Sequence, residues 1–259
     1  MKLINSWIKR VFDFTAAFSG LLIFSPFLTV VIITIWLQDF KSPFYISDRV
    51  GKNEKVFRIV KLRSMVAGAD KTGVDSTASN DARITVVGHV IRNYKLDELS
   101  QLWNVLKGDM SLVGPRPNVL RETDLYTQKE KELLKVKPGI TDFASIVFAD
   151  EGQILSDKEN PDLAYNQLIR PGKSELGLFY IQKQSLFLDI IIILITLISI
   201  ISREQALILI SFVLKKLGAS TDLLLVSGRK APLKPMPPVG ADTVVTDRIK
   251  KISDHDHRA

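Results

Sequence analysis

The longest apolar stretch lies near the N-terminus, where residues Phe14 to Leu37 are 24 uncharged and mostly apolar positions. A helix rises about 1.5 Å per residue, so this stretch is long enough to cross a hydrocarbon core about 30 Å thick. Ser25 and Pro26 stand at its middle. Proline removes a helical hydrogen bond and clashes with the preceding turn, so we expect the helix to bend sharply or break there. The serine hydroxyl can satisfy a freed carbonyl.

Basic residues flank both ends of this stretch: Lys9 and Arg10 precede it, and Lys41, Arg49 and Lys52 follow it. A helix that spans the membrane is the simplest interpretation of the hydropathy alone. The flanking charges give neither end a clear reason to cross, and with the proline they favour a re-entrant helix that enters and leaves on one face. We expect the two leading basic residues to contact anionic lipid headgroups.

Short strands and turns follow the apolar stretch. Residues 44–46 and 56–60 are rich in β-branched and aromatic side chains, and the Gly-Lys-Asn sequence at 51–53 is typical of the turn between them. Residues 66–83 are polar and predict a surface loop. An apolar stripe at helical spacing predicts a helix over residues 96–106.

The second half of the chain contains further apolar segments. Residues 119–136 predict another amphipathic helix. Residues 186–202 are apolar except for Asp189, and residues 206–214 are apolar again. This region can lie in the interface, dip into the bilayer or pack on the domain. From residue 228 onward the chain is rich in Pro, Lys and Asp, which predicts a disordered tail.

These patterns predict an α+β fold in a monotopic membrane protein. It consists of an N-terminal re-entrant helix-break-helix, a small mixed α/β catalytic domain and amphipathic interfacial helices. The expected divisions are residues 1–40 (membrane helix), 41–185 (catalytic domain), 186–227 (apolar membrane-associated segment) and 228–259 (tail).

Composition narrows the partners. The chain has 35 Lys and Arg against 28 Asp and Glu, a net charge of +7. Such a surplus suits nucleic acid, an anionic membrane or phosphorylated substrates. No recognised nucleic-acid module accompanies it, and the clustered apolar runs favour the membrane and phosphorylated substrates. The absence of cysteine excludes disulfides, thiol catalysis and cysteine metal sites.

The candidate chemistry lies in an adjacent acidic pair, Asp97 and Glu98, with Arg92 and Arg116 nearby in the sequence. One carboxylate can attack phosphorus while the other holds a divalent cation. Arginine offers a planar fork to phosphate oxygens, and a helix N-terminus favours anions. Successive helical residues point about 100° apart, so the two carboxylates would divide these roles. Acidic pairs also favour helix starts through the helix dipole alone, and on the pair alone a solvated helix start is the commoner explanation.

The wider sequence changes that balance, because the chain resembles the bacterial sugar transferase family. These are the monotopic phosphoglycosyl transferases that start glycan assembly on undecaprenyl phosphate. The similar segments occur in the family's order over roughly residues 8–145, which is more specific than any single motif. They are Lys9–Asp13, Ser25-Pro26, Phe57–Met65, Lys95–Leu99 with Asn104–Pro117, and Lys137–Thr141.

The resemblance implies a role for each candidate residue. Asp97 would attack the sugar-linked phosphorus of a UDP-sugar and expel UMP, and the phosphosugar would then pass from the aspartate to a polyprenyl phosphate. Glu98, together with Asp97, would bind Mg²⁺. Arg92 and Arg116 would bind phosphate. Lys61 and Arg63 would form a basic segment beside the site.

The resemblance also implies where the protein lies in the cell and which partners it has, but it does not predict the sugar or the oligomeric state. Ser25-Pro26 would be the break of a re-entrant helix that keeps the catalytic domain on the cytoplasmic face of the bacterial inner membrane. Partners would be the lipid bilayer, both substrates and downstream glycosyltransferases of polysaccharide or exopolysaccharide assembly. Many relatives read Gly-Trp-Ala-Gln where this chain has Asp142-Phe143-Ala144-Ser145, so the sugar is not predicted, and neither is the oligomeric state.

Two rival functions remain. An aspartyl-phosphate phosphohydrolase would need a residue that activates water, and no histidine is placed for that role. A membrane adaptor that has lost its chemistry would not need an intact set of Arg92, Asp97, Glu98 and Arg116.

Overall fold

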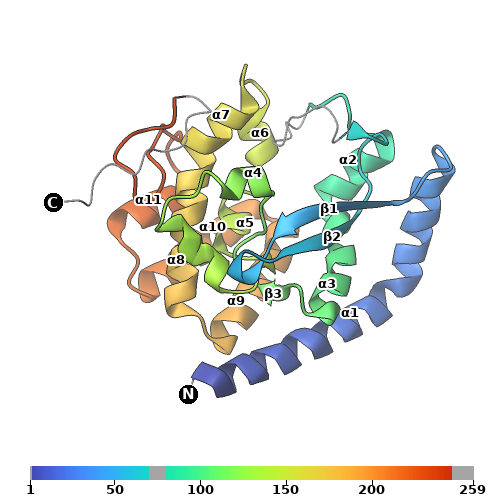
Figure 1. Ribbon diagram of the computed structural model, residues 1–259, viewed down its shortest axis with the longest axis horizontal. Coiled ribbons are helices and arrows are strands. Elements are labelled where there is room, and N and C mark those ends of the chain that lie inside the picture. The colour runs from blue at the N-terminus through green and yellow to red at the C-terminus, as the bar shows by residue number, and fades with distance from the viewer. Residues whose placement is uncertain (1, 70–79, 247–259) are drawn as a thin grey trace.

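The computed structural model describes residues 2–69 and 80–246. One long helix, α1, curves along the edge of an α+β domain in which a β-hairpin lies between two groups of helices (Figure 1). The strands are β1 (Phe44–Val50), β2 (Val56–Leu62), β3 (Ser111–Val113) and β4 (Gly139–Thr141). The helices longer than seven residues are α1 (Lys2–Leu37), α2 (Val86–Asn93), α8 (Arg170–Lys183), α9 (Leu186–Ile201), α10 (Arg203–Lys216) and α11 (Thr221–Gly228). The shorter helices are η1 (Lys52–Glu54), η3 (Leu96–Gln101), α3 (Leu102–Lys107), α4 (Leu120–Thr123), η4 (Glu130–Lys135), α5 (Phe143–Val147), α6 (Glu151–Leu155), α7 (Pro161–Ala164) and η5 (Tyr165–Ile169).

Helix α1 is continuous, with Pro26 inside it. Of the two expectations, a sharp bend or a break, no break occurs: the helix is uninterrupted at Pro26 and curves along the domain (Figure 1). The re-entrant arrangement stays a prediction. Pro26 has no N–H for the carbonyl of Leu22, four residues earlier. The Ser25 hydroxyl donates to that carbonyl at 2.8 Å, which confirms the expected compensation by serine. Because the freed carbonyl has a donor, the helix can continue past the proline.

Both ends of α1 contact the same domain. Near its start, Asp13 accepts hydrogen bonds from the Ser111 hydroxyl (2.8 Å) and the Leu112 N–H (3.1 Å). Near its end, Ile35 is fully buried in an apolar cluster with Leu62 and other residues of the domain. The helix therefore lies along the domain instead of pointing away from it.

The outer face of α1 is apolar and exposed. Residues Trp7–Leu37 are the one stretch, among the described residues, that is long and apolar enough to cross a membrane. Phe18, Ile23 and Val30 each expose more than half of their surface. No part of the described chain covers this face, so its composition suits contact with lipid.

The β1–β2 hairpin is antiparallel, with Val50 opposite Val56. Both expected strands and the turn between them are confirmed, and each strand is longer than the sequence pattern indicated. The helix expected over residues 96–106 is also present, but a 3₁₀ segment, η3, precedes the α-helical α3. Asn104, which is fully buried, joins α3 to β2: it accepts from the Val60 N–H (2.9 Å) and donates to the Arg58 carbonyl (2.7 Å).

The single helix expected over residues 119–136 is wrong, since α4 and η4 are separate. Thr127 and Glu130 start η4 by mutual capping: the Glu130 carboxylate accepts from the Thr127 N–H, and the Thr127 hydroxyl accepts from the Glu130 N–H, both at 3.1 Å. The Glu130 side chain also bonds to the buried Arg170. The helical pattern of residues 119–136 could not show this break, because the partner of Glu130 lies far along the chain.

Helices α9 and α10 pack on the domain with one face only. Ile192 and Ile210 are fully buried in the main core, whereas Leu194, Leu197 and Phe212 are more than half exposed. The segment expected to contact the membrane therefore packs one apolar face on the core and leaves other apolar side chains exposed.

The chain after α11 runs back over the domain. The Met236 N–H donates to the Gln167 carbonyl (3.0 Å), and the Thr127 hydroxyl donates to the Val239 carbonyl (2.5 Å). The described part of this segment therefore differs from the disordered tail that the sequence predicts, because polar groups of the domain form hydrogen bonds with its backbone. Residues 247–259 lie outside the described residues.

Candidate active site

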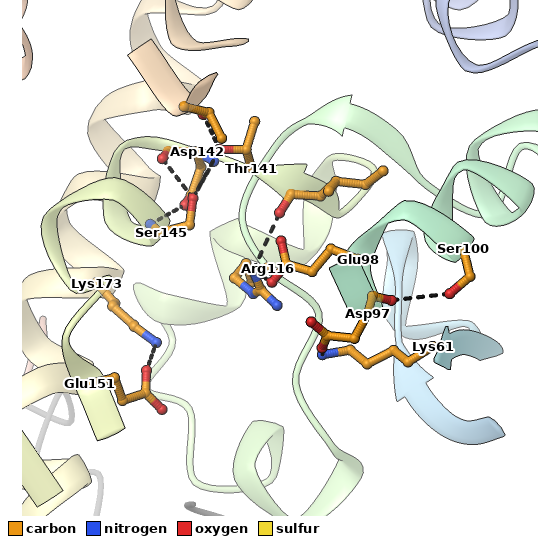
Figure 2. Close-up of polar contacts among 12 residues, drawn as sticks. Lys61, Asp97, Glu98, Ser100, Arg116, Thr141, Asp142, Ser145, Glu151 and Lys173 are labelled. Carbon is orange, nitrogen blue, oxygen red and sulfur yellow. Dashed lines mark hydrogen bonds and ion pairs between the residues drawn. The ribbon is translucent and has the colours of Figure 1, made fainter. Parts of the chain in front are cut away.

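Four charged side chains from three elements gather at one place: Lys61 from β2, Asp97 and Glu98 from η3, and Arg116 from the turn after β3 (Figure 2). The Arg116 guanidinium donates to the Glu98 carboxylate at 2.6 Å. The Lys61 ammonium lies 3.7 Å from the Asp97 carboxylate. All four side chains remain partly exposed, between 16% and 28%. The cluster can therefore still be reached by a ligand.

The backbone before Asp97 has an unusual conformation. Lys95 has φ of 53°, in the left-handed region that few residues other than glycine adopt. The Glu98 N–H donates back to the Lys95 carbonyl at 3.1 Å. The Ser100 hydroxyl lies 3.0 Å from both the Asp97 and Val60 carbonyls, which joins η3 to β2. The acidic pair is thus held on a short turn attached to the hairpin that carries Lys61.

Close packing of two backbone segments positions Arg116. A Cβ on Gly139 would lie 2.1 Å from the Gly114 nitrogen, so only glycine permits this approach. The Gly139 N–H donates to the Pro115 carbonyl at 3.0 Å, and β3 pairs with β4 in parallel just before it. Pro117 further restricts the turn. Arg116 therefore projects from a stiff base toward Glu98.

The two adjacent carboxylates differ electrostatically. Burial raises the pKa of the Asp97 carboxyl, although the charge of Lys61 opposes the rise. Burial acts in the same direction on Glu98, but Arg116 and Lys61 outweigh it and lower the pKa of Glu98. Burial lowers the pKa of the Lys61 ammonium. Glu98 is the firmly ionised member of the pair and is closely paired with arginine, whereas the contact of Asp97 with lysine is long.

Residues 4–203 match the family described as bacterial sugar transferase. The chain belongs to the bacterial sugar transferase family. The match covers the long helix, the hairpin, the charged cluster and α9, so the resemblance seen in the sequence is confirmed over most of the chain.

Relatives in this family have names that refer to undecaprenyl phosphate or exopolysaccharide. The chain is 34% identical over 202 residues to the UDP-N-acetylgalactosamine-undecaprenyl-phosphate N-acetylgalactosaminephosphotransferase of Aeromonas hydrophila, covering 77% of this chain and 45% of the relative. It is 36% identical to the undecaprenyl-phosphate glucose phosphotransferase of Komagataeibacter xylinus, covering 73% of this chain and 35% of the relative. It is 32% identical to the exopolysaccharide production protein ExoY of Rhizobium meliloti (strain 1021), covering 75% and 85%. The chain thus spans less than half the length of the first two relatives. These names support the enzyme class of undecaprenyl-phosphate sugar phosphotransferases.

Arg92 lies beside the charged cluster, and Arg63 lies away from it. Arg92 donates to the Ser64 hydroxyl at 2.9 Å and lies close enough to Asp97 for that carboxylate to act on its pKa, which burial lowers overall. Arg63 instead donates to both oxygens of Asp39, at 2.8 and 2.6 Å. Arg63 lies one residue beyond the end of β2 and pairs with Asp39 after the end of α1, so the structure does not bring it to the Asp97 cluster. Its expected role beside the phosphate site stays a prediction.

Lys9 and Arg10, expected to contact lipid headgroups, both have partners within the protein. The Lys9 ammonium lies 2.5 Å from the carboxylate of Asp189, which is fully buried in α9. Arg10 donates to the carbonyls of Val105 (2.6 Å) and Leu106 (2.7 Å) in the last turn of α3. Both side chains bind protein groups, because a buried carboxylate and helix C-terminal carbonyls need donors. Their contact with headgroups stays a prediction. Asp189, alone in an apolar run, was the sequence signal for such a partner.

The described residues could hold the expected magnesium ion through two carboxylates, but they do not form a cage of protein ligands around it. Across residues 2–69 and 80–246, no group of three or more His, Cys, Asp or Glu side chains is placed to hold a metal. Magnesium, however, is often bound through one or two carboxylates plus water and substrate phosphates. Asp97 and Glu98 are adjacent, partly exposed oxygen donors of that kind.

Proposed function

We propose that this protein transfers a sugar 1-phosphate from a UDP-sugar to undecaprenyl phosphate and releases UMP, as the first step in assembly of a cell-surface polysaccharide. The observation that carries the proposal is the cluster of Asp97 and Glu98 with two cations, Lys61 and Arg116, in a reachable site. Family membership and the names of relatives support the same reaction.

The proposed chemistry proceeds in two displacements. A carboxylate oxygen of Asp97 forms a bond to the sugar-linked phosphorus, and the bond from that phosphorus to the UMP oxygen breaks. An oxygen of undecaprenyl phosphate then bonds to the same phosphorus, and the aspartyl oxygen leaves as a carboxylate. Asp97 suits the nucleophile because the Lys61 ammonium lies 3.7 Å from its carboxylate, so an electron pair remains available.

The neighbouring residues stabilise negative charge in this scheme. Arg116 and Lys61 hold phosphate oxygens, and the planar fork of Arg116 is stiffly mounted. Glu98 and Asp97 would hold Mg²⁺, which when bound neutralises phosphate charge. Arg92 lies near Asp97 and adds positive charge at its side of the site.

We further propose that the domain lies on the cytoplasmic face and that both ends of α1 face the same side of the membrane. Support comes from the contacts of Asp13 and Ile35, near opposite ends of α1, with one domain. Single cysteines at Lys2 and at the exposed Lys55 can test this, since the chain has no other cysteine. Both should resist an impermeant thiol reagent in intact cells and react after the membrane is opened. Labelling of position 2 alone in intact cells would contradict a monotopic arrangement.

The reaction is tested with purified protein, UDP-sugars, Mg²⁺ and undecaprenyl phosphate. UMP should be released, a lipid-linked phosphosugar should form, and peptide mass spectrometry should find a phosphosugar on Asp97 when the acceptor is omitted. Sustained release of free sugar phosphate without the lipid would instead indicate the phosphohydrolase. No UMP with any donor would indicate the adaptor.

A further inference from the structure

A further ion pair lies on the opposite side of the site from Asp97 (Figure 2). The Lys173 ammonium of α8 bonds to the carboxylate of Glu151, the first residue of α6. In Figure 2 this pair lies across the site, with Arg116 between it and Asp97. Both side chains are partly exposed, at 21% and 30%.

Asp142 connects this pair electrostatically to the phosphate-binding side. Burial raises the pKa of the Asp142 carboxyl, and the charges of Arg116 and Lys173 both oppose the rise. The charges of Arg116 and Lys173 therefore both act on one buried carboxylate. The Lys173 ammonium also lies 5.2 Å from the ring centroid of Tyr165, which restricts its position.

The segment that carries Glu151 is fixed by ion pairs of the residue before it. Asp150, the preceding residue, lies 2.9 Å from the guanidinium groups of both Arg203 and Arg229. Arg229 also lies over the Phe148 ring, 5.4 Å from its centroid. These contacts fix the start of α6, and a side chain that recognises a ligand needs such support.

The chemistry of the pair suits a sugar. In the proposed reaction the hexose is attached to the phosphorus that Asp97 attacks, so it lies beside the four charged residues of the site. A sugar hydroxyl both donates and accepts hydrogen bonds; a lysine ammonium offers donors and a carboxylate offers acceptors. The pair Lys135–Glu132 shows the contrast, since its side chains are 66% and 48% exposed and it lies on the outer surface.

We propose that Lys173 and Glu151 bind hydroxyl groups of the hexose ring of the nucleotide sugar and determine which sugar is transferred. This assignment rests on the proposed transferase function, and it adds the residues that recognise the sugar. The phosphate-binding residues would accept any nucleotide sugar, and the ion pair would select among them.

The test compares Lys173→Ala and Glu151→Gln with the unchanged protein and with the control Lys135→Ala. UMP release and KM are measured with UDP-glucose, UDP-galactose and their N-acetylamino counterparts. Loss of a charged hydrogen bond to the sugar should raise KM for the preferred donor by about tenfold or more and change the ratio of kcat/KM between epimers. The control should keep both values.

A charge-reversed double variant, Lys173→Glu with Glu151→Lys, separates recognition from folding. It can re-form the ion pair, so its thermal unfolding should return toward that of the unchanged protein while its sugar preference stays altered. An unchanged preference in the active single variants, or its restoration by the double variant, would overturn the proposal. No UMP release by the unchanged protein with any donor would refute the proposed function itself, and this proposal with it.

Discussion

Two clusters of charged side chains differ in how completely the protein satisfies them. Glu130 and Arg170 are 0% and 2% exposed, and every nitrogen of the Arg170 guanidinium has an acceptor: Glu130, Asn166 or the Leu125 carbonyl. Ser174 also donates to Glu130. This cluster has no capacity left for a ligand, so its role is to join η4 to α8.

The cluster around Asp97 has the opposite character. Its side chains are partly exposed, and the contact between Lys61 and Asp97, at 3.7 Å, is longer than a hydrogen bond. Burial raises the pKa of Asp97 because the carboxylate has lost water without gaining close donors. Charges that the fold leaves incompletely paired are available to a charged substrate, whereas fully paired charges stabilise the fold.

The largest expected effect is on the incompletely paired cluster. Asp97→Asn keeps the shape but removes the attacking charge, so transfer should fall on the order of ten-thousandfold or more. Thermal unfolding should change little, since Asp97 has no close ion-pair partner. Parallel measurements of UMP release and melting temperature check both points. Turnover near that of the unchanged protein would eliminate the covalent mechanism.

A change in the fully paired cluster of Glu130 and Arg170 should instead lower the stability of the protein. Arg170→Ala leaves Glu130 buried without a counter-charge, so the free energy of unfolding should fall by about 3–5 kcal/mol. The double variant Glu130→Met with Arg170→Met removes both charges and should be more stable than Arg170→Ala. Thermal unfolding in detergent measures these differences. Equal losses in the single and double variants would show that packing, not the unpaired charge, causes the effect.

Arg116→Lys keeps the charge but removes the planar fork. We expect transfer to fall by about a hundredfold, because a point charge cannot make two parallel bonds to phosphate from this stiff turn. Steady-state kinetics at saturating donor measure the loss. Lys135→Arg, a change on an exposed surface pair, serves as the control. Full activity of Arg116→Lys would mean that charge alone suffices.

Among the three changes in the active site, Glu98→Gln should have the smallest effect on the reaction, and a specific one. If Glu98 holds Mg²⁺, the magnesium concentration for half-maximal activity should rise by about tenfold or more. A chelator should abolish activity in the unchanged protein, and added magnesium should restore it. An unchanged magnesium titration in an active Glu98→Gln variant would assign the metal to other groups.

Several features could be predicted from local sequence because neighbouring residues determine them. The hairpin follows from two β-prone runs around a turn, and the acidic pair at a helix start follows from residues 96–106. The Gly114–Pro117 turn is stiff because of its own composition. The helix through Pro26 was misjudged in part: the pattern showed the lost hydrogen bond and the serine that replaces it, but not that the helix would continue.

Other features depended on partners far along the chain. Sequence placed Lys61 and Arg63 in one basic segment, but Lys61 lies in β2 and faces Asp97, whereas Arg63 follows the end of the strand and pairs with Asp39. Lys9 has a basic character suited to headgroups, yet it pairs with Asp189, 180 residues away. By itself the sequence determined the family, the elements and the residues able to do the chemistry, because these depend on residue type and short spacing. Only the tertiary structure decided which charges face each other, since each buried charge must find its partner wherever the packed chain places one.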